Sequence, residues 1–144
     1  MQYVVGNADG HGKNVSFFSR PQGLAIAPFY DIVSTVQYRE LDAELAMAFG
    51  DEFDLAAVGP FDWADFAHRT NVPRAALVRE TRRFGKATAR HASELANSPE
   101  YTAEERDMAL KIAAFASTQA DRLLDMAGPT LEVDAKLFQE ASDP

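Results

Sequence analysis

Gly6-Asn7-Ala8-Asp9-Gly10-His11-Gly12-Lys13-Asn14 is the stretch that decides the fold, together with Phe29-Tyr30-Asp31 further along the chain. An aspartate stands five residues before an asparagine, and a second aspartate follows later. This spacing is typical of a phosphoryl-transfer site, in which the first aspartate accepts the proton of the attacking hydroxyl group and the other two residues hold magnesium. Asp9, Asn14 and Asp31 fit these three roles in this order.

Two short β-prone runs connect Asn14 to Asp31. Residues 14–19 and 24–28 flank Arg20-Pro21-Gln22-Gly23, in which Pro and Gly occupy favourable turn positions. The pattern predicts a β-hairpin, whose adjacent strands lie roughly 5 Å apart. We therefore expect Asn14 and Asp31 to lie close together. Two oxygen ligands suit magnesium, which completes its shell with water and substrate phosphates.

Other residues of the stretch allow more than one interpretation. Asp9-Gly10 alone is also an ordinary turn dipeptide. His11 fits a hydrogen-bonding strut that holds the loop as well as it fits direct contact with phosphate or with Asp9. Lys13 fits a solvated or structural role, with neutralisation of a transferred phosphate as the alternative. Gly12-Lys13 does not fit a Walker A loop, because Asn7 and Asn14 replace the glycine and the Ser or Thr that such a loop requires.

These motifs resemble those of the HipA family of serine/threonine kinases, the toxins of bacterial toxin-antitoxin pairs. The family segment Gly-x-x-Asp-x-His-x-Lys-Asn-x-Ser is similar to residues 6–16, and Ala/Thr-Pro-x-Tyr-Asp is similar to residues 27–31. Residues 44–50 and 61–67 resemble the strand and the helix that follow in the family. The resemblance extends over most of residues 1–127.

The resemblance implies roles for the site residues. Asp9 would be the catalytic base, assisted by His11, and Asn14 and Asp31 would ligate magnesium. Lys13, Asn14 and Asp31 would contact ATP, the co-substrate. The acceptor would be a serine or threonine hydroxyl of a protein, and family substrates include aminoacyl-tRNA synthetases.

Family members carry an amino-terminal lobe that supplies most of the nucleotide site and a regulatory phosphorylatable loop. Neither element occurs in these 144 residues. We therefore expect weak or absent ATP binding and little activity from this chain alone.

Two classes of function remain open. The chain can be the catalytic part of a kinase that needs a separate amino-terminal lobe. Alternatively, it is a non-catalytic interaction module that binds an antitoxin, a kinase partner or itself. In both cases we expect an uncovered apolar patch, and therefore self-association or partner binding, through residues 1–5 and the face that carries the site.

Composition limits the other possibilities. The chain has 144 residues, of which 47% are hydrophobic, enough for one core. It has no cysteine, which excludes disulfides and fits a reducing cytoplasm. Its apolar segments are shorter than the roughly 20 residues that cross a bilayer. The net charge of -8 argues against direct nucleic-acid binding, which depends on neutralising phosphates.

The whole sequence predicts a mainly α fold, the helical carboxy-terminal lobe of a protein-kinase-like domain over residues 1–128. Its small β component would consist of the hairpin at the catalytic loop and of strands near residues 44–49 and 53–58. Helices are predicted from Trp63 to Thr70 and from Pro73 onward. Residues 129–144 read as an acidic, loosely held tail.

The last helix has clear predicted ends. It opens with a capping box, in which Thr102 stands three residues before Glu105. It is expected to run to about Ala127, because Gly128-Pro129 should stop it.

The helix after Pro73 carries two side-chain patterns. Its core-facing stripe consists of Leu77, Thr81, Phe84, Thr88, His91 and Leu95, which makes His91 a core or core-edge residue. Its basic residues are Arg74, Arg79, Arg82, Arg83, Lys86 and Arg90. They fit the solvated face of a helix, with binding of a phosphate-rich or acidic partner as the alternative. Trp63 and Tyr30 are expected to anchor the core, and Tyr30 can also position the carboxylate of Asp31.

Overall fold

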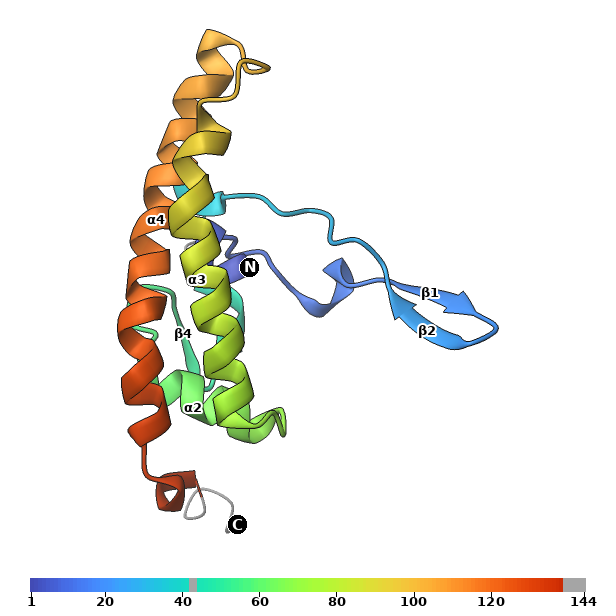
Figure 1. Ribbon diagram of the computed structural model, residues 1–144, viewed down its shortest axis with the longest axis vertical. Coiled ribbons are helices and arrows are strands. Elements are labelled where there is room, and N and C mark those ends of the chain that lie inside the picture. Colours follow the sequence, from blue (N-terminus) through green and yellow to red (C-terminus); the bar gives the residue numbers. More distant parts are fainter. Residues whose placement is uncertain (42–43, 139–144) are drawn as a thin grey trace.

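Two long helices form the body of the molecule. In the computed structural model, which describes residues 1–41 and 44–138, α3 (Arg74–Ala96) and α4 (Ala103–Glu132) lie side by side over their whole length (Figure 1). They approach closely at Gly85, where an added Cβ would lie 3.1 Å from Leu124 Cγ and 3.3 Å from the Ala120 carbonyl oxygen. The predicted mainly helical fold is confirmed.

The shorter elements pack against one side of this helix pair. They are α1 (Gln2–Val5), α2 (Pro60–Arg69) and the antiparallel strands β3 (Glu44–Phe49) and β4 (Glu52–Asp54). The core contains Tyr3 and Val4 of α1 with Leu45, Leu55, Val58, Ala116 and Leu123. The stretch that carries Asp9 therefore begins directly after a helix that is anchored in the core.

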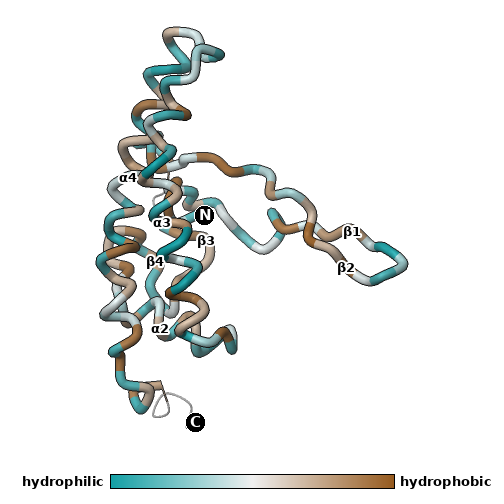
Figure 2. Tube along the Cα trace, viewed as in Figure 1, coloured by the Kyte–Doolittle hydropathy of each residue, from teal (hydrophilic) through white to brown (hydrophobic). Residues whose placement is uncertain are grey.

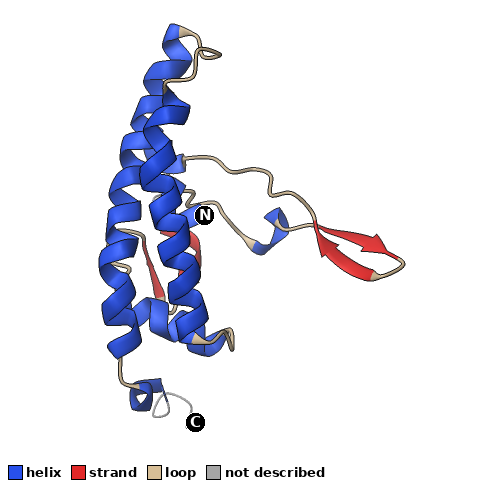
Figure 3. Cartoon of the chain, in the orientation of Figure 1, coloured by secondary structure: helices blue, strands red, loops and turns tan. Residues whose placement is uncertain are grey.

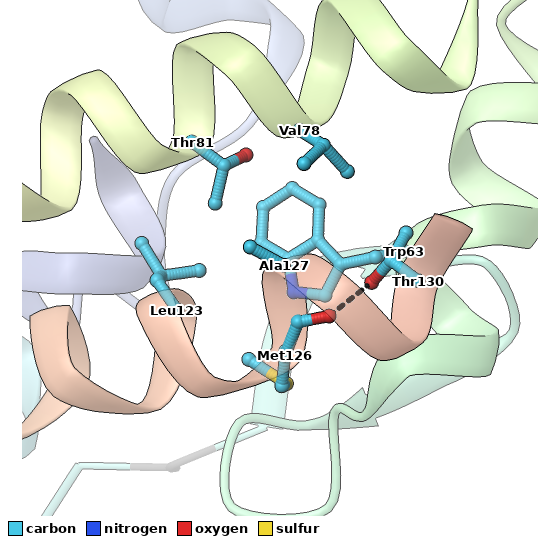
Figure 4. A pocket seen from close by; sticks show the side chains of 7 residues that line it. All are labelled: Trp63, Val78, Thr81, Leu123, Met126, Ala127 and Thr130. Atoms are coloured by element: carbon cyan, nitrogen blue, oxygen red, sulfur yellow. Dashed lines mark hydrogen bonds between the residues drawn. The ribbon is translucent and has the colours of Figure 1, made fainter. Parts of the chain in front are cut away.

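Trp63 is a core anchor, as predicted. Its ring lies between Val78 of α3 and Ala127 of α4 (Figure 4). It also packs edge-on against Tyr3 at a centroid distance of 5.7 Å. Aromatic contacts of this kind stabilise a core beyond the area that they bury.

The second sheet stands apart from the body. Strands β1 (Phe17–Arg20) and β2 (Gly23–Ile26) pair antiparallel, with Phe17 opposite Ile26 and Arg20 opposite Gly23. The predicted hairpin is confirmed, although its strands are shorter than expected and only Pro21 and Gln22 form the turn. We call residues 9–33, which carry this hairpin away from the body, the arm (Figures 1 and 3).

Several predicted boundaries differ from the structure. The predicted strand at residues 53–58 ends at Asp54, because the Arg122 guanidinium donates to the carbonyl oxygens of Leu55, Ala56 and Val58 at 3.4, 2.8 and 3.4 Å. These carbonyl groups therefore bond to a helix side chain instead of a neighbouring strand.

The end predicted for the last helix is also wrong. Helix α4 continues through Pro129 to Glu132. Proline removes one helical hydrogen bond, to the carbonyl group of Asp125, and Asp125 is exposed to water that can replace it. Part of the predicted tail forms a 3₁₀ turn, η3 (Ala135–Phe138), in which Phe138 is buried and stacks on His68. Residues 139–144 lie outside the described residues.

The core-facing stripe predicted for α3 is correct only in its first half. Leu77, Thr81, Phe84 and Thr88 are partly buried, but the side chain of His91 is 50% exposed and Leu95 is 65% exposed. His91 lies 3.1 Å from Glu94 Oε2 and is not a core residue. Within the described residues, the side chains of His91 and Leu95 near the end of α3 therefore lie open to solvent.

The basic residues of α3 lie mostly on its solvated face. Arg79, Arg82, Arg83, Lys86 and Arg90 are exposed, and Arg79 and Arg83 both pair with Glu80, at 3.2 and 2.9 Å. None of the helices in residues 1–41 and 44–138 has the length and hydropathy that a membrane crossing requires.

Candidate active site

The predicted ligand pair lies at the base of the hairpin. Asn14 closes a short 3₁₀ turn, η1 (Gly12–Asn14), and Asp31 lies in the returning segment of the arm, after β2. The Asn14 Nδ2 amide donates to Asp31 Oδ2 at 2.7 Å. The hairpin thus brings together two residues that are 17 positions apart in the sequence.

The side-chain chemistry of this pair fits a hard cation. Asn14 Oδ1 accepts the His11 backbone N–H at 3.0 Å and has a second lone pair. Asp31 is exposed, and within the described chain its Oδ1 makes no hydrogen bond. One carboxamide and one carboxylate oxygen match the few protein ligands that Mg²⁺ takes. Residues 1–41 and 44–138 contain no group of three or more His, Cys, Asp or Glu side chains arranged for a metal.

Asp9 lies in a neighbouring cleft and is exposed. The cleft measures about 310 Å³ and is lined by Ala8, Asp9, Thr35, Leu41, Glu44 and Ala46. Asp9 makes no hydrogen bond to Asn14 or Asp31 within the described chain, so the structure brings two of the three predicted residues into contact and leaves the third nearby in the loop. A general base needs this access, because its carboxylate must reach the substrate hydroxyl group.

The loop that carries Asp9 is fastened at its amino-terminal end, through Gly6 and Ala8. Gly6 ends α1 in the left-handed conformation at φ 67°, and an added Cβ would lie 2.4 Å from Val36 Cγ2. The Ala8 N–H donates to Thr35 Oγ1 at 2.7 Å, and the Thr35 hydroxyl donates to the Gly6 carbonyl oxygen at 3.0 Å. The Ala46 N–H of β3 donates to the Ala8 carbonyl oxygen at 2.7 Å.

His11 and Lys13 occupy different environments. His11 is partly buried, and within the described residues its buried Nδ1 has no hydrogen-bond partner. The side chain of Lys13 is exposed, whereas its carbonyl oxygen accepts the Tyr30 hydroxyl at 2.8 Å. Tyr30 is 46% exposed, so its predicted role as a core anchor is wrong. Its hydroxyl group ties the returning segment of the arm, next to Asp31, to the 3₁₀ turn η1.

The structure identifies one further polar residue of the motif, whose contacts the spacing did not predict. Asn7 is 3% exposed, and its Nδ2 donates to Gln2 Oε1 at 2.9 Å and to the Asp31 carbonyl oxygen at 3.0 Å. Its place between Gly6 and the Asp9 loop was the only available signal. The hydrogen-bonding partner of Asn7 is 24 residues away, so spacing could not identify it.

The helical fold and the loop that carries Asp9 agree with a known protein family. Residues 1–96 match the HipA-like C-terminal domain, two thirds of the chain, and the chain therefore belongs to this family. The predicted family resemblance is confirmed.

The relatives to which the chain is similar are kinases. It is 40% identical over 83 residues to the serine/threonine-protein kinase toxin HipA of Shewanella oneidensis, covering 58% of this chain and 19% of that protein. It is 45% identical over 69 residues to the putative kinase Y4mE of Sinorhizobium fredii, covering 48% of this chain and 16% of that protein. The chain thus matches less than a fifth of the length of each relative.

A solved structure supports the same assignment. It is the Shewanella oneidensis complex of HipA, HipB and operator DNA, with a TM-score of 0.83 and 29% sequence identity. The match covers 93% of this chain and 32% of the solved chain. The similarity therefore extends through α4, beyond the residues that the family match covers.

Proposed function

We propose that this chain supplies the catalytic loop of a HipA-like, ATP-dependent serine/threonine protein kinase. The observation that carries the proposal is the 2.7 Å contact between Asn14 and Asp31, next to a loop that exposes Asp9 in a cleft. Similarity to a kinase toxin and to a putative kinase supports it. ATP, magnesium, a protein substrate and a cytoplasmic location belong to this proposal.

Each loop residue has a part in the proposed reaction. The substrate hydroxyl oxygen attacks the γ-phosphorus, the bond from that phosphorus to the β–γ bridging oxygen breaks, and ADP leaves. Asp9 accepts the hydroxyl proton. Asn14 Oδ1 and the Asp31 carboxylate would hold Mg²⁺, which neutralises charge on the phosphates when it is bound. His11 holds the loop through its backbone, and Lys13 extends toward solvent where a phosphate can approach.

The 144 residues hold one side of the nucleotide cleft. Phosphoryl transfer depends mostly on positioning and on electrostatic stabilisation of the phosphates. Within the described residues, no glycine-rich loop covers the pair formed by Asn14 and Asp31. We therefore expect the chain alone to bind Mg-ATP weakly or not at all.

The second candidate is an interaction module without catalysis. The exposed apolar side chains of the arm favour it, among them Phe17 at 58%, Leu24 at 75% and Ile26 at 55% exposure. The same surface would also result if an amino-terminal lobe packs here in the kinase. If the chain is an interaction module, its partner would be an amino-terminal kinase lobe, an antitoxin or a second copy of the chain.

Phosphoryl transfer by a fusion protein separates the two candidates. The upstream part of the Shewanella kinase toxin is joined to Met1, and incorporation of label from γ-³²P-ATP into protein is measured. The kinase proposal predicts activity in the fusion, little in the isolated chain, and a loss of about 10²- to 10⁴-fold for Asp9→Asn, because an amide cannot accept the proton. Asp107→Asn, an exposed substitution on α4, is the matched control and should leave activity unchanged. Activity that ignores Asp9→Asn would refute the kinase role of the loop.

A further inference from the structure

The Asn7 carboxamide connects the core to the proposed cation site. Asn7 directly follows α1 and Gly6, and its Nδ2 group uses both hydrogens, one toward Gln2 Oε1 and one toward the Asp31 carbonyl oxygen. A carbonyl oxygen only accepts, so the nitrogen of Asn7 must face Asp31. The orientation of this amide is therefore determined by chemistry.

The backbone of Asp31 is in an uncommon conformation. Its φ is 56°, in the left-handed region, which residues with a side chain adopt only uncommonly. In this conformation the carboxylate of Asp31 accepts a hydrogen bond from Asn14 while its carbonyl oxygen accepts one from Asn7. Strained residues persist where surrounding contacts hold them. The Asn7 hydrogen bond is made to this same residue.

Few other contacts hold Asp31 in place. The arm extends away from the body (Figure 1), and within the described residues the extensive contacts of β1 and β2 are with each other. Figure 2 shows apolar residues along the arm that have no covering layer. The direction of the Asp31 carboxylate thus depends on contacts near the base of the arm. Buried Asn14 bonds to the side chain of Asp31, and buried Asn7 bonds to its backbone.

We propose that Asn7 is a positioning residue, which holds Asp31 in the conformation that places its carboxylate beside Asn14. The connection runs from α1, whose Tyr3 and Val4 lie in the core, through Asn7 to Asp31 and then to Asn14. This inference rests on the proposed function in one respect, namely that Asp31 and Asn14 bind a cation.

Asn7→Asp tests the proposal because it keeps the shape of the side chain. It replaces the donor that faces the Asp31 carbonyl group by an oxygen, and the two acceptors repel each other. The substitution also adds negative charge near a cation site. If Asn7 lies near the site but does not position Asp31, the added negative charge would strengthen cation binding. If Asn7 positions Asp31, the substitution should weaken cation binding about 10-fold, as is typical when the hydrogen-bond partner of a metal ligand is lost.

Two readouts separate this inference from the proposed function. The first is the NMR signal of the Asn14 side-chain amide without metal, which should move toward the value of a free carboxamide in Asn7→Asp. The second is the Mn²⁺ affinity from water proton relaxation, with Asp31→Ala as background. If wild type binds Mn²⁺ no better than Asp31→Ala, the proposed cation site fails, and the first readout still decides the role of Asn7.

Control variants make the outcome decisive. Thr130→Val removes a buried hydroxyl on α4, which donates to the Met126 carbonyl oxygen at 2.8 Å, and should change neither readout. Gln2→Ala removes the other partner of Asn7 from a half-buried position. It should shift both readouts in the same direction as Asn7→Asp but less, and it serves if Asn7→Asp does not fold. An unchanged Asn14 amide signal in the folded Asn7→Asp, or in Gln2→Ala if only that variant folds, would overturn the proposal.

Discussion

Thr35 shows how one side chain at the base of the arm holds the loop that carries Asp9. Its hydroxyl group is the hydrogen-bond partner of the buried Ala8 N–H. Thr35→Val keeps the shape and leaves this N–H unpaired, whereas the Gly6 carbonyl oxygen keeps its bond from the Val36 N–H at 3.2 Å. We expect the free energy of unfolding to fall by about 1–3 kcal/mol, the cost of a buried unsatisfied donor.

Urea denaturation followed by circular dichroism measures this change. The control is Thr118→Val, whose exposed hydroxyl donates to the Ala114 carbonyl oxygen at 3.1 Å within α4. It should change the stability by no more than about 0.5 kcal/mol. Equal effects of the two substitutions would show that the Thr35 hydroxyl does not fasten the loop.

At the scale of residues, local pattern predicted part of the site. The turn at Pro21 and Gln22 returns the chain to its starting edge, which is why the contact between Asn14 and Asp31 could be expected and is confirmed. Asn7 and Thr35 were not predicted, because their contacts bridge 24 and 27 positions without a periodic pattern. The catalytic and cofactor roles of Asp9, His11, Lys13, Asn14 and Asp31 stay predictions.

At the scale of elements, the capping box of α4 makes stability depend on pH. The Thr102 N–H donates to Glu105 Oε2 at 2.8 Å, and the Thr102 hydroxyl accepts the Glu105 N–H at 3.3 Å. The backbone hydrogen bond from Thr102 lowers the pKa of Glu105 below its ordinary value. A carboxyl group with a lowered pKa stabilises the folded state above its ordinary pKa, and this contribution is lost as the pH falls through the lower, folded-state pKa.

We therefore expect acidification to fray the start of α4. Amide hydrogen exchange at the first turn should increase as the pH falls through the folded-state pKa of Glu105. In Glu105→Gln the first-turn amides should show no such dependence on pH. Glu104→Gln, which alters the adjacent exposed glutamate, is the control and should retain the wild-type profile. In the wild type, amide exchange at the first turn could depend on pH only through the intrinsic exchange rate. That result would contradict this expectation.

Element types were more predictable than element ends. The capping box and the hairpin carry local signals that the structure confirms. The stop at Gly128-Pro129 failed because packing of the buried residues on either side, Ala127 and Thr130, outweighs one lost hydrogen bond. The exposure of His91 could not be predicted either. Periodic apolar residues show which face of a helix is apolar, but they do not show whether another element covers that face.

At the scale of the whole molecule, the arm presents apolar side chains to solvent. Patches beyond a few hundred Å² commonly mark interfaces. We expect the isolated chain to self-associate with increasing concentration, and Leu24→Lys, at the most exposed apolar side chain of the arm, to weaken this association. Leu110→Lys, at a 40% exposed leucine on α4, is the control and should associate as wild type does.

Sedimentation velocity over a range of concentrations measures this behaviour. A wild-type chain that stays strictly monomeric at high concentration would contradict the prediction. Association that Leu24→Lys leaves unchanged would place the contact elsewhere on the molecule. A fusion with the upstream part of the Shewanella kinase toxin should bury the arm and stay monomeric if that part packs here.

The central claim is that Asn14 and Asp31 form one cation site, and an NMR titration with Mg²⁺ tests it most directly. The chain carries 22 acidic residues, so binding must be distinguished from a general attraction of cations. We expect saturable shifts of the NMR signals of the Asn14 side-chain amide and of the backbone around Asp31. These shifts should be lost in Asp31→Asn and retained in Asp121→Asn, an exposed control on α4. Shifts spread over the acidic surface and identical in Asp31→Asn would contradict it.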